Sequence, residues 1–245
     1  MSKFYAIVAG AGSGTGASVA LRFAKTYPVV LLARKSANYE PIVQEIRAAG
    51  GSAYGYTADA SDPASVDGAF AQIEKDLQGH KLAAAVYNAN AGFAYKPFLE
   101  LKVEDLDTSL GTAANGLFYF AQKTLPQLLD AASSSPHPPS LLVTGATASI
   151  RGSAKFTTFA AGKFAQRAIT QSLAREFGPQ GVHVALAIID GVIDTPWGKE
   201  RTANNGVEDG KIAAEAIAES YWHLHTQPRS AFTHELDIRP YVEKF

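Results

Sequence analysis

The sequence predicts a single α/β domain, a doubly wound parallel sheet of about seven strands with helices on both faces. Short apolar runs alternate with longer helical patterns along nearly all of the 245 residues, and this alternation is typical of βαβ units. Two of the runs, 29–32 and 83–86, are apolar at every position, as expected of strands that are buried on both faces. Because 47% of the residues are hydrophobic, the chain can bury one large core, and we expect one domain over residues 1–245.

In chain order, each of the first six expected strands is followed by an expected helix. The strands are short apolar or β-branched runs at 5–9, 29–33, 52–58, 82–88, 140–144 and 183–189, with a seventh expected within 233–238. The helices are longer stretches with a helical pattern at 16–26, 39–49, 63–77, 106–130, 157–177 and 211–223. The connections are short except at 133–139, which is rich in Ser and Pro and is expected to be a surface loop.

Charge and composition exclude several classes of partner. The net charge of -1 offers no basic surface for nucleic acid or anionic lipid, so we expect a small-molecule substrate and neither nucleic acid nor a membrane as partner. The absence of cysteine excludes disulfides, thiolate metal sites and cysteine nucleophiles. His223 and His225 are two residues apart on an expected helix and point to different faces, so no metal site is expected. The N-terminal apolar run 4–9 is too short for a signal peptide, and cytoplasmic location is the expectation.

A glycine-rich segment follows the first expected strand and opens the first expected helix. Glycine lets the backbone turn sharply and approach a diphosphate, while the helix N-terminus offers unpaired N–H groups to the phosphate charge. The alternative is a tight structural turn. The position of the segment inside a βα unit favours nucleotide binding. The residues assigned to this loop are Gly10, Gly12, Ser13, Gly14, Thr15 and Gly16.

The spacing of Gly10, Gly14 and Gly16 resembles the G-x-x-x-G-x-G motif of the short-chain dehydrogenase/reductase family. The resemblance covers essentially the whole chain. It implies a Rossmann fold, a nicotinamide cofactor, oxidoreductase activity and assembly into a homodimer or homotetramer. A divergent subgroup of this family carries phenylalanine at the position of the catalytic tyrosine, and the chain resembles that subgroup.

The resemblance also implies which residues contact the cofactor. Arg34 follows the second expected strand, where NAD-preferring relatives carry an acidic residue, and a guanidinium can bind a 2′-phosphate, so NADP(H) is favoured over NAD. The alternative for Arg34 is an ordinary surface cation. Asp59 matches an aspartate that contacts adenine, although it can also be a helix-flanking acid. Thr195 matches the threonine that holds the nicotinamide carboxamide. The end of the family's N-N-A-G element is matched by Asn90, Ala91 and Gly92.

Three of the four catalytic positions of the family are replaced. The tyrosine that exchanges a proton with the substrate oxygen is Phe159 here, and a phenyl ring has no ionisable group. The serine that polarises the carbonyl is Ala146, and the asparagine position falls on Ala113. Lys163 remains, four residues after Phe159 and on the same helix face, and the resemblance implies that it binds the ribose; the alternative is a solvated helix lysine.

Other polar side chains can substitute for the missing groups. Thr144, Thr147 and Ser149 lie near the serine position and can supply a hydroxyl, or each can satisfy local backbone instead. Asp190 replaces the family's proline and brings a carboxylate near the expected nicotinamide, with Asp194 as a weaker candidate; capping or solvent exposure is the alternative for both. The catalytic residues predicted from the sequence are Lys163, Thr147 and Asp190.

The sequence leaves three functions open. The first is an NADP(H)-dependent oxidoreductase for a small carbonyl, alcohol or enone. The second is a non-redox lyase, isomerase or cyclase on the same fold, and the third is a nucleotide-binding pseudoenzyme or regulatory subunit. Phe93, Tyr95 and Trp197 lie in loops after expected strands, where they can line an apolar substrate pocket or cover the core.

Overall fold

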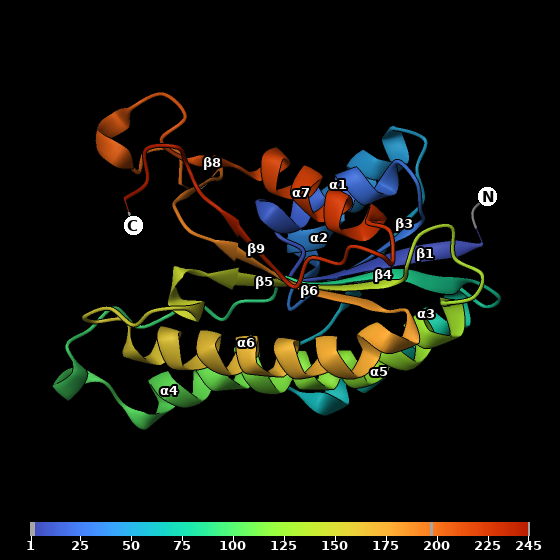
Figure 1. Cartoon of the computed structure of the whole chain (residues 1–245), viewed down its shortest axis with the longest axis horizontal. Coiled ribbons are helices and arrows are strands. Elements are labelled where there is room, and N and C mark those ends of the chain that lie inside the picture. The colour runs from blue at the N-terminus through green and yellow to red at the C-terminus, as the bar shows by residue number, and fades with distance from the viewer. Residues whose placement is uncertain (1–2, 197, 245) are drawn as a thin grey trace.

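The computed structural model describes residues 3–196 and 198–244, and its centre is a sheet of seven parallel strands in the order β3-β2-β1-β4-β5-β6-β9 (Figure 1). The order turns back between β1 and β4, which opens a crevice at the carboxyl ends of these strands. The predicted fold class is therefore confirmed. The strands are β1 (Phe4–Ala9), β2 (Val29–Ala33), β3 (Ala53–Thr57), β4 (Lys81–Tyr87), β5 (Ser140–Ala146), β6 (His183–Ile189) and β9 (Glu235–Ile238).

The helices cover the sheet in two layers, as Figure 1 shows. One face of the sheet shares a hydrophobic core with a layer of three helices: α1 (Thr15–Ala24), α2 (Ser36–Ala48) and α7 (Ala214–Thr226). The opposite face packs against α3 (Pro63–Asp76), α5 (Gly116–Ala131) and α6 (Thr157–Phe177), with α4 (Val103–Leu110) beside α6. The continuously apolar runs behave as expected, because every residue of β2 and every residue of β4 after Lys81 is buried.

The expected helix 106–130 is divided in the structure. α4 ends at Leu110, a π-helical turn spans Gly111–Asn115, and α5 begins at Gly116. The hydroxyl of Tyr87, from β4, donates a hydrogen bond of 2.5 Å to the carbonyl oxygen of Thr112 within this turn. A side chain that bonds into the helical ladder is a known cause of such a distortion. Sequence periodicity does not reveal the break, because the side chain that bonds to the turn, Tyr87, belongs to β4 and not to the helix itself.

The ends of the other expected elements differ from the structure by a few residues. α2 begins at Ser36 rather than at residue 39, and α7 covers Ala214–Thr226 rather than 211–223. The chain before α7 is drawn into a small additional sheet, because β8 (Ile212–Ala213) pairs in parallel with β7 (Ile193–Asp194). No helix in the described ranges combines the length and the apolar character needed to cross a bilayer.

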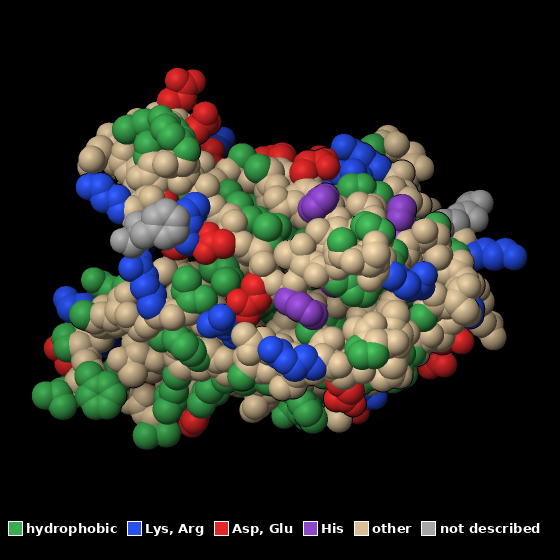
Figure 2. Space-filling view, viewed as in Figure 1, with side chains coloured by type: hydrophobic (Ala, Val, Ile, Leu, Met, Phe, Trp, Pro, Cys, Tyr) green, Lys and Arg blue, Asp and Glu red, His purple; other side chains and the backbone are tan. Residues whose placement is uncertain are grey.

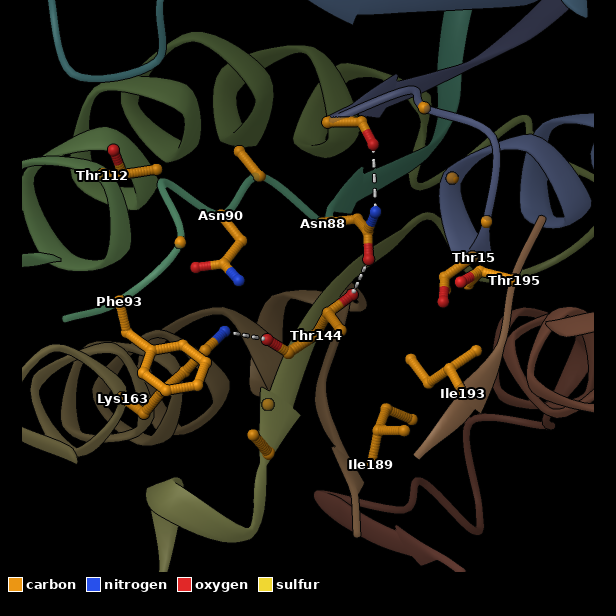
Figure 3. Close-up of a pocket in the computed structure, with 18 of the residues that line it drawn as sticks. Thr15, Asn88, Asn90, Phe93, Thr112, Thr144, Lys163, Ile189, Ile193 and Thr195 are labelled. Atoms are coloured by element: carbon orange, nitrogen blue, oxygen red, sulfur yellow. Dashed lines mark hydrogen bonds between the residues drawn. The ribbon is translucent and has the colours of Figure 1, made fainter. Parts of the chain in front are cut away.

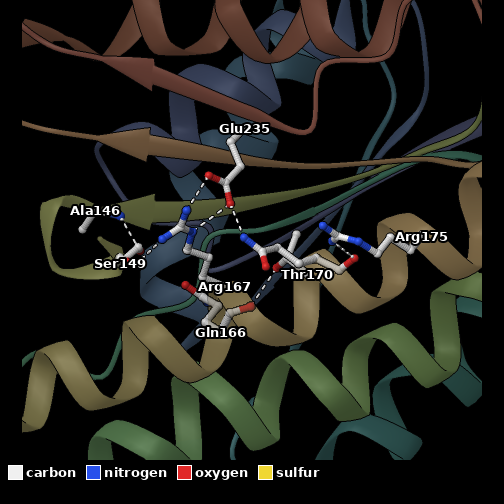
Figure 4. A network of polar contacts seen from close by, with 8 residues as sticks. Ala146, Ser149, Gln166, Arg167, Thr170, Arg175 and Glu235 are labelled. Carbon is white, nitrogen blue, oxygen red and sulfur yellow. Dashed lines mark hydrogen bonds and ion pairs between the residues drawn. The ribbon is translucent and has the colours of Figure 1, made fainter. Parts of the chain in front are cut away.

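The edge strand β9 is tied to α6 by a polar network (Figure 4). Arg167 on α6 forms a bidentate ion pair with Glu235 on β9, with distances of 2.8 and 2.9 Å, and Gln171 donates to the same carboxylate at 2.8 Å. Arg167 also reaches the carbonyl oxygen of Ser149, at 3.5 Å. The network thus connects the last strand, α6 and the turn that follows β5.

Candidate active site

A cleft of about 990 Å³ opens at the carboxyl ends of β1, β4, β5 and β6. Nearly every residue predicted for the site lines it. Ala91 lies between two lining residues and does not itself line the cleft. The predicted residues that line the cleft are Gly10, Gly12, Ser13, Gly14, Thr15, Gly16, Arg34, Asp59, Asn90, Gly92, Thr147, Lys163, Asp190 and Thr195.

The glycine loop between β1 and α1 has both the shape and the opening that a diphosphate requires. A Cβ on Gly10, whose φ is +85°, would lie 2.5 Å from the backbone of Ala89, and one on Gly16 would lie 2.4 Å from the Gly10 carbonyl oxygen. A Cβ on Gly12 would meet no atom within 4 Å. The cap residue of α1 is Gly14, which has no side chain that could bond to the N–H groups of the first helical turn. The N-terminus of α1 therefore faces the cleft with backbone groups that can bind an anion.

Arg34 and Asp59 lie at the adjoining ends of β2 and β3. The carboxylate of Asp59 accepts hydrogen bonds from the hydroxyl and the N–H of Ser61, at 2.7 and 2.9 Å. The Ser61 hydroxyl lowers the pKa of Asp59, and the nearby charge of Arg34 also lowers it. Arg34 is exposed, and its guanidinium has no hydrogen-bond or ion-pair partner among residues 3–196 and 198–244. The guanidinium is thus available to a ligand in the cleft.

Asn88, which the sequence analysis did not single out, connects three strands at the centre of the cleft (Figure 3). Its amide nitrogen donates to the Gly10 carbonyl oxygen at 3.0 Å, and its amide oxygen accepts from the Thr144 hydroxyl at 3.0 Å. The Thr144 hydroxyl is also 2.8 Å from the hydroxyl of Tyr221, which therefore acts as the donor to Thr144. Thr144 is occupied by this network. The sequence feature that could have identified Asn88 as a site residue is its position directly after the apolar strand β4.

Lys163 is buried on α6 with its amine at the cleft. Its Nζ donates to the carbonyl oxygen of Thr144 at 2.8 Å and to the amide oxygen of Gln166 at 3.0 Å (Figure 3 shows the first contact). Burial lowers the pKa of Lys163 to about 8. A protonated amine has three N–H donors, so one remains for a ligand. Gln166 was not predicted, although its spacing of three residues from Lys163 places both on one helix face.

Thr147 and Asp190, the other two predicted catalytic residues, are bonded to each other. The Thr147 hydroxyl donates to one carboxylate oxygen of Asp190, and Arg239 lies 3.1 Å from the other oxygen. The backbone N–H of Asp190 also donates to Ile238, at 2.8 Å. The carboxylate therefore has protein partners on both oxygens, and it connects the end of β6 to the C-terminal segment. Arg239 lies 49 residues from Asp190 along the chain, beyond any local motif.

Four aromatic side chains, which we call the aromatic wall, stand at the mouth of the cleft: Phe93, Tyr95, Phe156 and Phe159. Phe93 stacks on Phe159 with ring centres 4.8 Å apart and on Phe156 at 5.1 Å. Tyr95 meets Phe156 edge-on at 5.1 Å. All except Tyr95 line the cleft. Trp197, the remaining aromatic candidate, lies outside the described residues.

Comparisons with known proteins agree with this geometry. The family model for short chain dehydrogenases matches residues 5–206. The chain belongs to the short-chain dehydrogenase/reductase family. An uncharacterized oxidoreductase of Staphylococcus epidermidis is 30% identical over 239 residues, which are 96% of each chain. The chain is thus a short-chain dehydrogenase-like oxidoreductase, as its sequence indicated.

Solved structures of family members have the same fold. A short-chain dehydrogenase from Rhodopseudomonas palustris superposes with a TM-score of 0.81 at 30% identity, covering 98% of this chain and 100% of that one. A short chain dehydrogenase from Burkholderia cenocepacia, solved in complex with NADP, has a TM-score of 0.83 at 24% identity and covers 98% of both chains.

Three residues were predicted from the sequence to stand at replaced tetrad positions: Ala146, Ala113 and Phe159. Ala146 lines the cleft at the end of β5, and its N–H donates to the hydroxyl of Ser149, which is fully buried. Ser149 is thus committed to the local backbone rather than to the cleft. Ala113 is buried in the π-helical turn, whereas the nearby Asn115 is exposed. Phe159 belongs to the aromatic wall.

The β7 region has one polar atom ready for a ligand. The hydroxyl of Thr195 is buried, lines the cleft and has no hydrogen-bond partner within the described part of the chain. An unpaired buried hydroxyl costs free energy that a bound polar group would recover. Asp194, the weaker acidic candidate, is exposed and lies 3.7 Å from Lys211. The described residues hold no cluster of three His, Asp or Glu side chains suited to a metal ion.

The family's fold binds a nicotinamide cofactor, and this chain's residues fit one. The open space at Gly12 suits a diphosphate, and the unpartnered Thr195 hydroxyl suits a polar ligand group deeper in the cleft. The Arg34 guanidinium stands at the β2 end of the same cleft. A dinucleotide that extends across the crevice can meet all three.

Proposed function

We propose that this chain is an NADP(H)-dependent oxidoreductase that acts on a small carbonyl, alcohol or enone substrate through a site without the usual tyrosine and serine. The observation that carries the proposal is the exposed, unpartnered Arg34, which opens into the same cleft as the glycine loop and Lys163. A planar guanidinium favours the 2′-phosphate of NADP. The NADP complex of the Burkholderia cenocepacia relative supports the same choice.

In this proposal, each half of the cofactor has its own protein contacts. The N-terminus of α1 holds the diphosphate, Arg34 binds the 2′-phosphate and Asp59 lies beside the adenine. Thr195 holds the carboxamide with its free hydroxyl, and Lys163 gives its remaining N–H to the ribose. The bound cofactor supplies or accepts a hydride at its nicotinamide ring. Asn88 keeps the ends of β1, β4 and β5 in register around these contacts.

The replaced tyrosine limits the rate but does not prevent hydride transfer. Loss of a positioned general acid costs about a hundred- to ten-thousandfold in rate. Positioning of donor and acceptor alone can contribute about 7–11 kcal/mol to catalysis. Thr147 and Asp190 are bonded to each other, and Asp190 also pairs with Arg239. Because the remaining N–H of Lys163 is assigned to the ribose, the positive charge of Lys163, rather than a hydrogen bond from it, is the better-placed group to stabilise a developing negative charge.

Thermal unfolding with each cofactor tests the proposal. A ligand at about a hundred times its dissociation constant adds roughly 2.7 kcal/mol of stability, so NADPH is expected to raise the melting temperature more than NADH at equal concentration. A panel of aldehydes, ketones and enones is then followed by loss of NADPH absorbance. Binding together with turnover supports the oxidoreductase. Binding without any turnover would favour a nucleotide-binding pseudoenzyme, a reading that the loss of three tetrad positions also supports.

A further inference from the structure

Three phenylalanine rings line the substrate end of the cleft. Phe93 comes from the loop after β4, and Phe156 and Phe159 come from the start of α6, so two distant segments form one apolar surface. The ring planes of Phe93 and Phe159 are inclined by only 30°, and those of Phe93 and Phe156 by 29°. Phe93 is 46% exposed, so part of its ring is open to a ligand. Aromatic surfaces of this kind prefer offset-stacked planar partners.

The missing acid also restricts which reductions are feasible. Hydride addition to an isolated ketone produces an alkoxide, a strong base that needs a proton from the protein as it forms. Hydride addition to the β-carbon of an enone produces an enolate, whose charge is delocalised and which can wait for a proton from water. Lys163 is a cation close to Phe159, because its Nζ is 5.9 Å from the Phe159 ring centre, and a cation stabilises an anionic oxygen without transferring a proton.

We propose that the preferred substrate is a planar α,β-unsaturated carbonyl compound whose double bond is conjugated to an aromatic ring. The proposal rests on the proposed oxidoreductase function and narrows it to one substrate class. The aromatic ring stacks against Phe93 and Phe156, and the carbonyl oxygen points toward Lys163. The β-carbon accepts one hydride, which carries its own electron pair, from NADPH. The carbon–carbon π pair moves to form the enolate, and water protonates the α-carbon and leaves as hydroxide to the solvent. The products are the saturated ketone and NADP⁺.

Three substrates separate the two parts of this proposal. The aromatic enone 4-phenyl-3-buten-2-one has both the ring and the conjugation, 4-phenyl-2-butanone has the ring alone, and 3-penten-2-one has the conjugation alone. We expect kcat/KM for the aromatic enone to exceed that for the saturated ketone by at least about 100-fold, the usual contribution of a general acid. The product is expected to be 4-phenyl-2-butanone and not the allylic alcohol.

Two variants test the stacking surface. Phe93→Leu is expected to raise KM for the aromatic enone about three- to tenfold, the equivalent of one aromatic pair, and to leave KM for 3-penten-2-one unchanged. Phe98→Leu is the matched control, because Phe98 is 69% exposed and does not line the cleft. Binding is measured separately by calorimetry with NADP⁺-loaded enzyme, which has no hydride to give. There, Phe93→Leu is expected to weaken binding of the aromatic enone by the same factor.

The outcomes separate this inference from the function on which it rests. Turnover of saturated ketones at a rate equal to that of enones, formation of the allylic alcohol, or an unchanged enone affinity in Phe93→Leu would overturn the substrate class and leave the oxidoreductase intact. Cofactor binding without turnover of either class overturns the oxidoreductase itself. Selective conversion of the aromatic enone, lost in part in Phe93→Leu and retained in Phe98→Leu, supports the inference.

Discussion

The two halves of the cleft differ in what they retain of the family pattern. The cofactor half, formed by the glycine loop, Arg34 and Asp59, keeps residue types that bind a phosphorylated nucleotide. In the substrate half, formed by Ala146 and the aromatic wall, Ala146 and Phe159 stand where the sequence analysis expects the family's serine and tyrosine. Lys163 lies where the halves meet. In the proposed function, cofactor binding and proton transfer are therefore separable, because each depends on its own side chains on a shared scaffold.

The largest expected effect comes from enlarging Gly10. Its φ of +85° and the 2.5 Å approach of Ala89 to an added Cβ leave no space for a side chain. Gly10→Val should lower the free energy of unfolding by at least about 3 kcal/mol and abolish NADPH binding. Calorimetric melting and fluorescence titration measure the two effects.

Gly12→Ala is the matched control for that experiment. An added Cβ there meets nothing within 4 Å, so stability should change by less than about 1 kcal/mol. NADPH affinity should nevertheless fall at least about tenfold, because the methyl group occupies space assigned to the diphosphate. Unchanged affinity in this variant would contradict the placement of the diphosphate.

Phe159→Tyr tests whether the substrate half still positions a carbonyl. A phenol at this position lies one helical turn from Lys163 and restores a proton donor, so reduction of saturated ketones should rise by about tenfold to a hundredfold. Reduction of the aromatic enone should change much less. Steady-state rates with both substrates give the ratio. A similar gain for both would argue against the enolate route.

The pH dependence of cofactor binding tests Lys163. Burial lowers its pKa to about 8, so the amine loses its proton as the pH rises through that value. The dissociation constant of NADPH is therefore expected to increase between pH 7 and about 9, because the positive charge and one N–H donor are lost. Lys163→Met should remove this dependence. A dependence that persists in Lys163→Met would assign it to another group.

Arg34→Ala sharpens the assignment of the cofactor half. The loss of one guanidinium contact to a 2′-phosphate should weaken NADPH binding about tenfold to a hundredfold, the value of a charge-assisted hydrogen-bond pair. NADH binding should stay within about twofold of its starting value. An equal loss of affinity for both cofactors would show that Arg34 contributes to the electrostatic potential of the whole cleft and does not recognise the 2′-phosphate.

The smallest effect is expected far from both halves, at the network that holds β9. Glu235→Gln replaces the carboxylate paired with Arg167 while keeping the shape of the side chain. The free energy of unfolding should fall by about 1 kcal/mol, since the pair is only partly buried. NADPH affinity should not change. A large loss of affinity would mean that the link from Arg167 to Ser149 positions the cleft.

The sequence by itself determined the fold class and the place of the glycine loop, and it predicts Phe159 at the position of the family's tyrosine. Strand burial and βα alternation can be predicted from local patterns, and the glycines of the loop lie within one short segment. These predictions therefore need no knowledge of distant residues. The position of Phe159 followed from its spacing to Lys163. The roles of these residues in catalysis stay predictions.

Only the tertiary structure decided which side chains are engaged and which are open. The π-helical turn accepts a hydrogen bond from Tyr87 on β4, and the carboxylate of Asp190, after β6, pairs with Arg239, after β9. The aromatic wall joins the loop after β4 to the start of α6. Such contacts join residues that are far apart in the chain. Sequence periodicity indicates only which helix or strand a segment forms and which of its faces is apolar.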